Sequence, residues 1–222
     1  MENNESKYNT EELKSGAKDT LDETKEVLKN LDVKTEAKAT ENFLKEFIKQ
    51  PLDAVLQVAN SGKKHLSLAL VLVLISTAAA IIQRISQIFS WNLRWTFSNI
   101  FSIPRAAIAP VLGLLVISVI VIILKENNKK SLADIITVVT IAHIPNVIAS
   151  VISLLTVISS QASRITTPIS GLASVLSIVL LYFSLKTVSG EENDSKFFMT
   201  FFKIYGLFVV VRFILSFLEI WI

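Results

Sequence analysis

The stretch SLADIITVVTIAHIPNVIASVISLL, residues 131–155, is long and apolar, but it carries a histidine, a proline and an asparagine near its middle. A helix needs about 20 residues to cross a hydrocarbon layer of roughly 30 Å, and this stretch meets that length. Pro145 has no amide hydrogen and its ring crowds the carbonyl of Ile141. We therefore predict a membrane-spanning helix that bends at this point.

Two polar residues flank the predicted bend. Asn146 belongs to a stripe of small and polar residues, with Ala142, Ala149 and Ser153, that favours close packing and hydrogen bonds between helices. We expect a neutral His143 that hydrogen-bonds a backbone carbonyl, and the alternative is a site for protons or a ligand. We expect no metal, because no carboxylate follows His143 at ligand spacing, and no cofactor.

The chain as a whole is too apolar for a soluble domain of its size. Of its 222 residues 51% are hydrophobic, and the mean hydropathy is +0.54. This composition predicts an all-α, polytopic membrane bundle with five transmembrane helices. The predicted helices are Leu66–Gln83, Ala106–Leu124, a span within Ile135–Ser163, Ile165–Leu185 and a span from about Phe198 to Ile222.

Three parts follow one another along the chain. Residues 1–41 are rich in Lys, Glu and Thr, which predicts a polar, partly disordered tail. Residues 42–62 are predicted to form an amphipathic helix in the headgroup plane, and the alternative is that this helix packs against the membrane body. Residues 63–222 are predicted to form the five-helix transmembrane domain. Within it, the apolar connection over residues 84–105 is expected to lie along the outer leaflet as a short helix, and the alternative is a re-entrant element that lines a pathway.

Positive charges near the spans indicate the orientation of the chain. The side of the amino terminus has nine (Lys45, Lys49, Lys63, Lys64, Lys125, Lys129, Lys130, Lys186, Lys196) and the other side has four (Arg84, Arg94, Arg105, Arg164). Positive charge concentrates on the cytoplasmic side of a membrane. We therefore predict a multi-pass protein of the plasma membrane with a cytoplasmic amino terminus and an external carboxyl terminus. Trp91, Trp95 and Trp221 then fall at the outer interface, which suits amphipathic rings.

Arg212 is the residue least suited to a bilayer. If the fifth span starts just after Lys203, Arg212 lies near the midplane, where a charge costs from about 2.5 to more than 10 kcal/mol unless it is paired or reaches water. Glu219 and Asp134 are the candidate partners. We expect a buried ion pair that fixes helix register, and the alternatives are a side chain that reaches the interface without a special role and a substrate or proton site.

Common catalytic patterns are missing from the sequence. It contains no cysteine, no phosphate-binding loop of the Gly-x-x-x-x-Gly-Lys type, no Gly-x-Ser-x-Gly elbow and no His-Glu-x-x-His. Basic residues flank the spans and do not alternate with aromatic residues on one soluble surface. We therefore predict neither an enzyme nor a nucleic-acid-binding protein.

The order of these features resembles the Yip family of membrane proteins, first associated with Ypt/Rab GTPases, in its bacterial form. The resemblance rests on the hydrophilic amino-terminal region, the amphipathic segment KQPLDAVLQV (residues 49–58), the five spans and the proline in the middle of the third span. It implies a five-helix membrane domain with a cytoplasmic amino terminus. It also implies membrane organisation through protein partners. The abundance of Lys, Asn and Ile indicates a low-GC Gram-positive bacterium.

From these features we expect a non-enzymatic membrane adaptor or scaffold. Its expected partners are the lipid bilayer and a protein bound through the amino-terminal tail, with a homo-oligomer as a further option. The alternative is a small permease, channel or transporter subunit that uses His143, Arg212 and Glu219 inside the membrane. A protein that blocks a membrane-active toxin is the third class.

Overall fold

A computed structural model describes residues 10–29, 33–90, 97–124 and 130–217, and all regular structure in these ranges is helical. The α-helices are α1 (Thr10–Lys29), α2 (Val33–Lys49), α3 (Pro51–Ser61), α4 (Leu66–Ser90), α5 (Phe97–Leu124), α6 (Leu132–Ala142), α7 (Ile144–Ser153), α8 (Leu155–Ile158), α9 (Ser163–Ser189) and α10 (Asp194–Phe217). Two 3₁₀ turns, η1 (Gly62–His65) and η2 (Ser160–Ala162), connect neighbouring helices.

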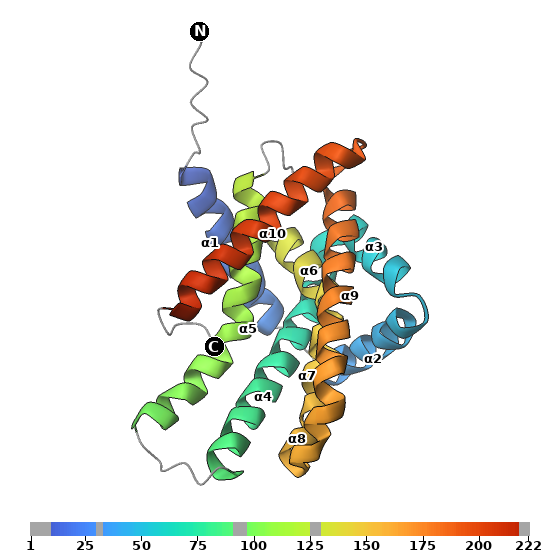
Figure 1. Ribbon diagram of the computed structural model, residues 1–222. Helices are drawn as coiled ribbons and strands as arrows, with labels where there is room; N and C mark the ends of the chain where they lie inside the picture. The colour runs from blue at the N-terminus through green and yellow to red at the C-terminus, as the bar shows by residue number, and fades with distance from the viewer. Residues whose placement is uncertain (1–9, 30–32, 91–96, 125–129, 218–222) are drawn as a thin grey trace.

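Helices α4, α5, α9 and α10 are each long and apolar enough to cross a membrane. Helix α6 together with α7 and α8 passes the same test as a pair bent by 49°. If the bent pair is counted as one span, the described residues contain five candidate spans, the predicted number. The all-α bundle is thus confirmed. Figure 1 shows α10 crossing the other long helices obliquely, with α2 and α3 on one side of the bundle.

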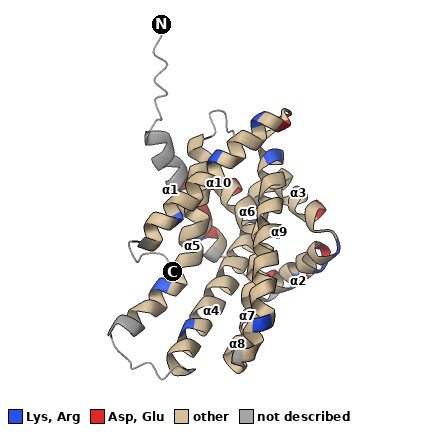
Figure 2. Ribbon diagram, in the orientation of Figure 1, with Lys and Arg blue, Asp and Glu red and all other residues tan. Residues whose placement is uncertain are grey.

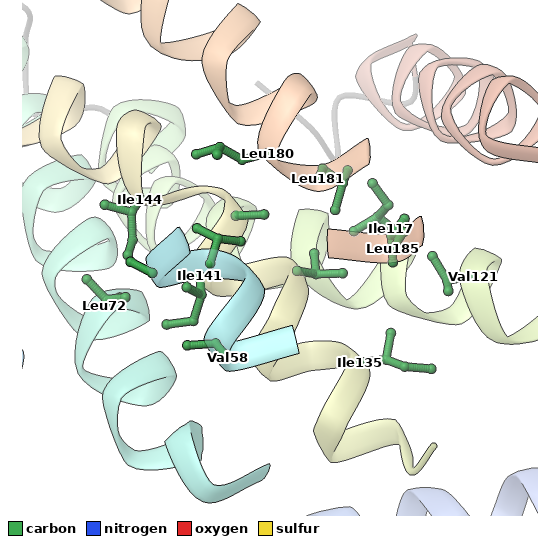
Figure 3. Close-up of a cluster of buried hydrophobic side chains, with 14 of the residues drawn as sticks. Val58, Leu72, Ile117, Val121, Ile135, Ile141, Ile144, Leu180, Leu181 and Leu185 are labelled. Carbon is green, nitrogen blue, oxygen red and sulfur yellow. The ribbon is translucent and has the colours of Figure 1, made fainter. Parts of the chain in front are cut away.

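Buried apolar side chains gather around α6. Side chains from α3, α4, α5, α7 and α9 meet there, as Figure 3 shows. The most deeply buried members include Val58, Leu72, Ile117, Val121, Ile135, Ile141, Ile144, Leu180, Leu181 and Leu185. Between helices in lipid this packing contributes mainly van der Waals contact, because lipid tails are as apolar as leucine.

Helix α6 begins with a capping box. Ser131 Oγ accepts from the Asp134 amide at 3.1 Å, and an Asp134 carboxylate oxygen accepts from the Ser131 amide at 2.9 Å. These two bonds satisfy donors that the first turn of a helix leaves without intrahelical partners. The turn at Gly62 lies directly against Asp134, so this carboxylate also joins η1 to α6.

The amphipathic segment packs on the membrane body. Val55 and Val58 of α3 are fully buried, and α3 lies against α9 and α6. This arrangement matches the second of the two alternatives for residues 42–62. Helix α2 starts at Val33, so part of the predicted tail is helical and the boundary at residue 42 falls within a helix.

The connection between the first two spans differs from its prediction. Helix α4 continues to Ser90 and α5 starts at Phe97, so most of residues 84–105 extends the two spans instead of forming a separate short helix. The predicted interfacial helix is therefore wrong. Apolar side chains let each helix continue, and Pro104 is tolerated within α5. Trp91, Trp95 and Trp221 lie outside the described residues. Figure 2 shows that the long helices are mostly free of charged side chains along their described lengths.

We expect Gly62→Ala to destabilise the protein more than Gly190→Ala. Both glycines have positive φ, but Gly190 lies in the left-handed α region, which costs an alanine roughly 1–2 kcal/mol, whereas Gly62, with φ 58° and ψ −128°, lies outside it, where alanine is at least as strained. A methyl group on Gly62 would also collide with the Asp134 carboxylate, whereas one on Gly190 would have nothing within 4 Å. Thermal unfolding of both variants in detergent micelles measures the difference. Equal losses would show that the contact with Asp134 carries no additional strain.

Candidate functional site

The middle span breaks at His143, where α6 and α7 meet. Pro145 lies in the first turn of α7, the position where a missing amide hydrogen costs least. The His143 amide donates to the carbonyl of Thr140 at 3.1 Å, three residues back, which makes this turn tighter than that of an α-helix. The predicted bend at the proline is confirmed.

The break leaves one backbone carbonyl without its usual amide donor, and the His143 side chain forms a hydrogen bond with it. Its Nδ1 lies 2.7 Å from the oxygen of Val139, which in a continuous helix would accept from the His143 amide. Because a carbonyl oxygen only accepts, Nδ1 is the donor. The expected bond between His143 and a backbone carbonyl is therefore confirmed. An unsatisfied buried carbonyl would cost about 1–3 kcal/mol, so the side chain stabilises the broken span.

Polar residues on α7 join it to two other helices. Ser174 Oγ of α9 lies 3.3 Å from Asn146 Oδ1 and donates to it. Gln83 Nε2 of α4 donates to Ser153 Oγ. The predicted stripe of small and polar residues thus makes interhelical hydrogen bonds, as membrane helices commonly do.

A cavity of about 540 Å³ lies between α4, α5, α6, α7, α9 and α10. Its wall follows α4 from Leu72 to Gln87, sixteen residues and about 22 Å of helix. Polar side chains from all of these helices except α5 face the cavity. They are Ser76, Gln83, Arg84 and Gln87 of α4, Thr140 of α6, His143 at the break, Asn146 and Ser150 of α7, Ser174 and Ser177 of α9, and Tyr205 and Arg212 of α10.

The cavity brings together three of the candidate residues found in the sequence. His143, Asn146 and Arg212 line it, and Pro145 sets the direction of the helix that carries Asn146. Asp134 belongs to the capping box of α6 and is not part of the wall. Glu219 lies outside the described residues, so its pairing with Arg212 stays a prediction.

Arg212 sits farther along its helix than expected. Helix α10 begins at Asp194, four residues before the predicted start of the span near Phe198 and nine residues before Lys203, from which the depth of Arg212 was reckoned. Arg212 is therefore five residues from Phe217, the last described residue of the helix, and not near its middle. Arg212 lines the cavity, but the residue is exposed, so the expectation that its charge is buried in an ion pair is wrong.

Aromatic packing explains the early start of α10. Phe197 and Phe201 lie edge-on to the ring of Tyr182 in α9, with ring centroids 5.2 and 5.1 Å away. Both phenylalanines are buried, and such pairs add about 0.5–1.5 kcal/mol beyond their burial. Lys203 is exposed, and its long side chain can keep the ammonium group at the interface while the helix continues.

Arg84 is held in the wall by neutral partners. Its Nε donates to Ser102 Oγ of α5 at 2.7 Å, and one terminal nitrogen donates to Gln87 Oε1 at 3.0 Å. These contacts fix the plane of the guanidinium group without neutralising its charge.

Ser177 supplies a buried hydroxyl that has no protein partner. Its side-chain oxygen is inaccessible from outside and is one of three such oxygens in the described part of the chain without a hydrogen bond. Ser177 also belongs to the cavity wall. A buried hydroxyl without a partner is costly, and although the residue lines the cavity, its oxygen is not accessible to water from that space.

Metal binding has no support in the described ranges. No group of three His, Asp or Glu side chains in them is close enough to hold an ion. The arrangement instead offers hydroxyl, amide and guanidinium groups, which bind a ligand by hydrogen bonds and charge.

Sequence reasoning overlooked the contribution of α4. Arg84 was counted from the sequence only as a positive charge that flanks the first span. Ser76, Gln83, Arg84 and Gln87 recur at helical spacings on one side of α4, and this pattern is the signal that could have found them. It was hidden because the predicted span ended at Gln83.

Comparisons of the chain with protein-family models, with curated proteins and with solved structures find no match.

We expect His143→Leu to destabilise the protein and His143→Asn to do so much less. Leucine leaves the Val139 carbonyl without its donor, at a cost of about 1–3 kcal/mol. Asparagine can place an amide nitrogen where Nδ1 stands and keep the bond. Thermal unfolding in detergent micelles measures both variants. Equal stability of the two would show that the bond to Val139 does not stabilise the break.

Proposed function

We propose that this protein binds a small water-soluble solute in its intramembrane cavity and acts as a small permease or transporter subunit. Sequence alone favoured an adaptor, and the cavity favours the alternative. The observation that carries the proposal is the meeting of Arg84, His143, Asn146 and Arg212 in one hollow between spans.

The size and the lining of the cavity support a binding role. A volume of about 540 Å³ falls in the range of roughly 300–1,000 Å³ typical of ligand sites. An anchor needs only apolar helix contacts, whereas polar and charged side chains within spans are expensive and mark solute pathways. The proposed role is non-enzymatic, since it requires recognition and release of a solute and no covalent step.

The proposed orientation places the amino terminus in the cytoplasm of the plasma membrane. The ends of α9 and α10 that meet through the ion pair of Lys186 with Asp194 belong to the lysine-rich side. Along α4, the residues that line the cavity extend from Leu72 to Gln87, in the direction away from the lysine-rich side. In this orientation the cavity extends from the middle of the bilayer to its outer half. The resemblance to the Yip family and a bacterial source stay predictions.

An adaptor role is the second candidate, and the helices outside the spans favour it. Helix α1 lies against α4 and α6, and α2 turns its exposed residues Lys45, Glu46 and Ile48 away from the bundle. Ile48 is 72% exposed and offers an apolar contact that a protein partner could cover, with Lys45 and Glu46 at the polar rim.

Cysteine substitutions test whether the cavity admits water-soluble molecules. The chain has no cysteine, so one introduced thiol reports a single position. Ser76 lines the cavity, whereas Leu74, two residues away on the same helix, is 55% exposed on the surface that faces lipid. We expect charged methanethiosulfonate reagents to modify Ser76→Cys roughly tenfold faster than Leu74→Cys or more, because a thiol among lipid tails does not ionise. Equal rates would contradict a water-accessible cavity.

Two further variants separate the candidate functions. Arg212→Leu removes a charge from the cavity wall, and deletion of residues 1–32 removes α1 but keeps α2 and α3. A solute-binding role predicts that Arg212→Leu abolishes the cellular phenotype that depends on the chain and that the deletion preserves it. An adaptor predicts the reverse. Membrane content of each variant, measured by immunoblot, controls for loss of the protein.

A further inference from the structure

The charges in the cavity wall are all of one sign. Arg84 comes from α4 and Arg212 from α10, and no Asp or Glu is among the described residues that line the space. The partners of Arg84, Ser102 and Gln87, are neutral and leave its positive charge in the wall, and Arg212 brings a second positive group to the same wall from another helix. A surrounding of low polarity strengthens the field of such a charge in comparison with water.

Arg84 has donors available for a ligand. A guanidinium group carries five N–H donors in a rigid plane, and the bonds to Ser102 and Gln87 use two of them. Those bonds also hold the plane in a defined direction. A fixed guanidinium group with remaining donors is the arrangement that proteins use for carboxylate and phosphate groups.

A neutral donor lies in the same wall. The Ser177 hydroxyl is 1% exposed and has no hydrogen-bond partner in the protein. It comes from α9, a helix separate from those that carry the arginines. Its oxygen is not accessible from the cavity in this structure, so the hydroxyl can donate to an anionic oxygen there only after its side chain rotates, and that bond would then remove the cost of leaving it without a partner.

We propose that the cavity selects an anionic group, a carboxylate or a phosphate, and excludes cations. This inference rests on the proposed function and names the charge class of its solute. The anionic group is carried either by a small solute or by the headgroup of an anionic lipid, and both present the same oxygens to Arg84 and Arg212.

The charge of thiol reagents tests the selection directly. Full-length protein with Ser76→Cys is placed in phosphatidylcholine nanodiscs, where both faces are accessible. Its rates with an anionic (sulfonatoethyl) and a cationic (trimethylammonioethyl) methanethiosulfonate are compared, each divided by the rate with a free thiol. We expect the normalised ratio to favour the anion by about tenfold, the order of one unit charge felt across several ångströms of protein.

Three arginine variants in the Ser76→Cys background identify the source of the preference. Arg84→Gln and Arg212→Gln should each reduce the ratio severalfold, whereas Arg212→Lys should keep it. Arg164→Gln is the matched control, since Arg164 is exposed at the start of α9 and does not line the cavity. The rate with neutral methyl methanethiosulfonate shows whether each variant keeps the cavity accessible.

Competition then separates the two sources of the anionic group. Protection of the thiol by inorganic phosphate indicates a free anion, and protection in nanodiscs that contain phosphatidylglycerol indicates a headgroup. Either result supports the proposal. A normalised ratio that favours the cation in the parent protein would overturn it. A ratio that Arg84→Gln and Arg212→Gln both leave unchanged would overturn it as well. A reactive Ser76→Cys without charge preference would overturn this inference and leave the proposed function standing, whereas a cysteine that charged reagents do not modify would overturn the proposed function itself.

Discussion

Every backbone polar group in a bilayer needs a partner inside the protein, and the break at His143 shows how this chain meets that constraint. Pro145 cannot donate, and the tighter turn before it diverts the His143 amide to Thr140. The carbonyl of Val139 is then left to the imidazole ring. One side chain therefore makes a 49° change of direction tolerable within a span. The polar residues of α7 point to α4 and α9 because of that change, so the interhelical bonds and the cavity both depend on it.

The cavity also bears on the free-energy cost of placing arginines within the spans. An isolated guanidinium group among lipid tails costs at least about 2.5 kcal/mol, and two within spans would consume much of the stability of a protein of this size. For Arg84, the hydroxyl of Ser102 and the amide of Gln87 replace the lipid, and Arg212 lines the same hollow while it stays exposed. Helices without charged residues would form a bundle without this cost. The presence of two arginines within the spans is therefore better explained by the proposed recognition of a solute than by packing.

Local features of this molecule could be predicted from the sequence, whereas features that need several helices could not. Five apolar stretches and a proline define the spans and the bend, because length and a missing amide hydrogen act within one segment. The carbonyl bond of His143 was expected for the same reason. The cavity requires six helices, and no pattern in one segment reveals it. The predicted start of the last span, about Phe198, lies four residues after the start of α10 at Asp194, and the packing of Phe197 and Phe201 on α9 holds these first turns.

The two ends of α10 differ in how firmly they are held, and this asymmetry bears on access to the cavity. Its first half is anchored, since Phe197, Phe201 and Ile204 are buried. Its second half exposes most of its side chains and still supplies Arg212 to the wall. Segments with few buried contacts move at the lowest free-energy cost. A displacement of this half away from the bundle would widen the cavity without disturbing the aromatic cluster or the core around α6. The helix that brings Arg212 to the cavity is thus less deeply buried at that end than at its start.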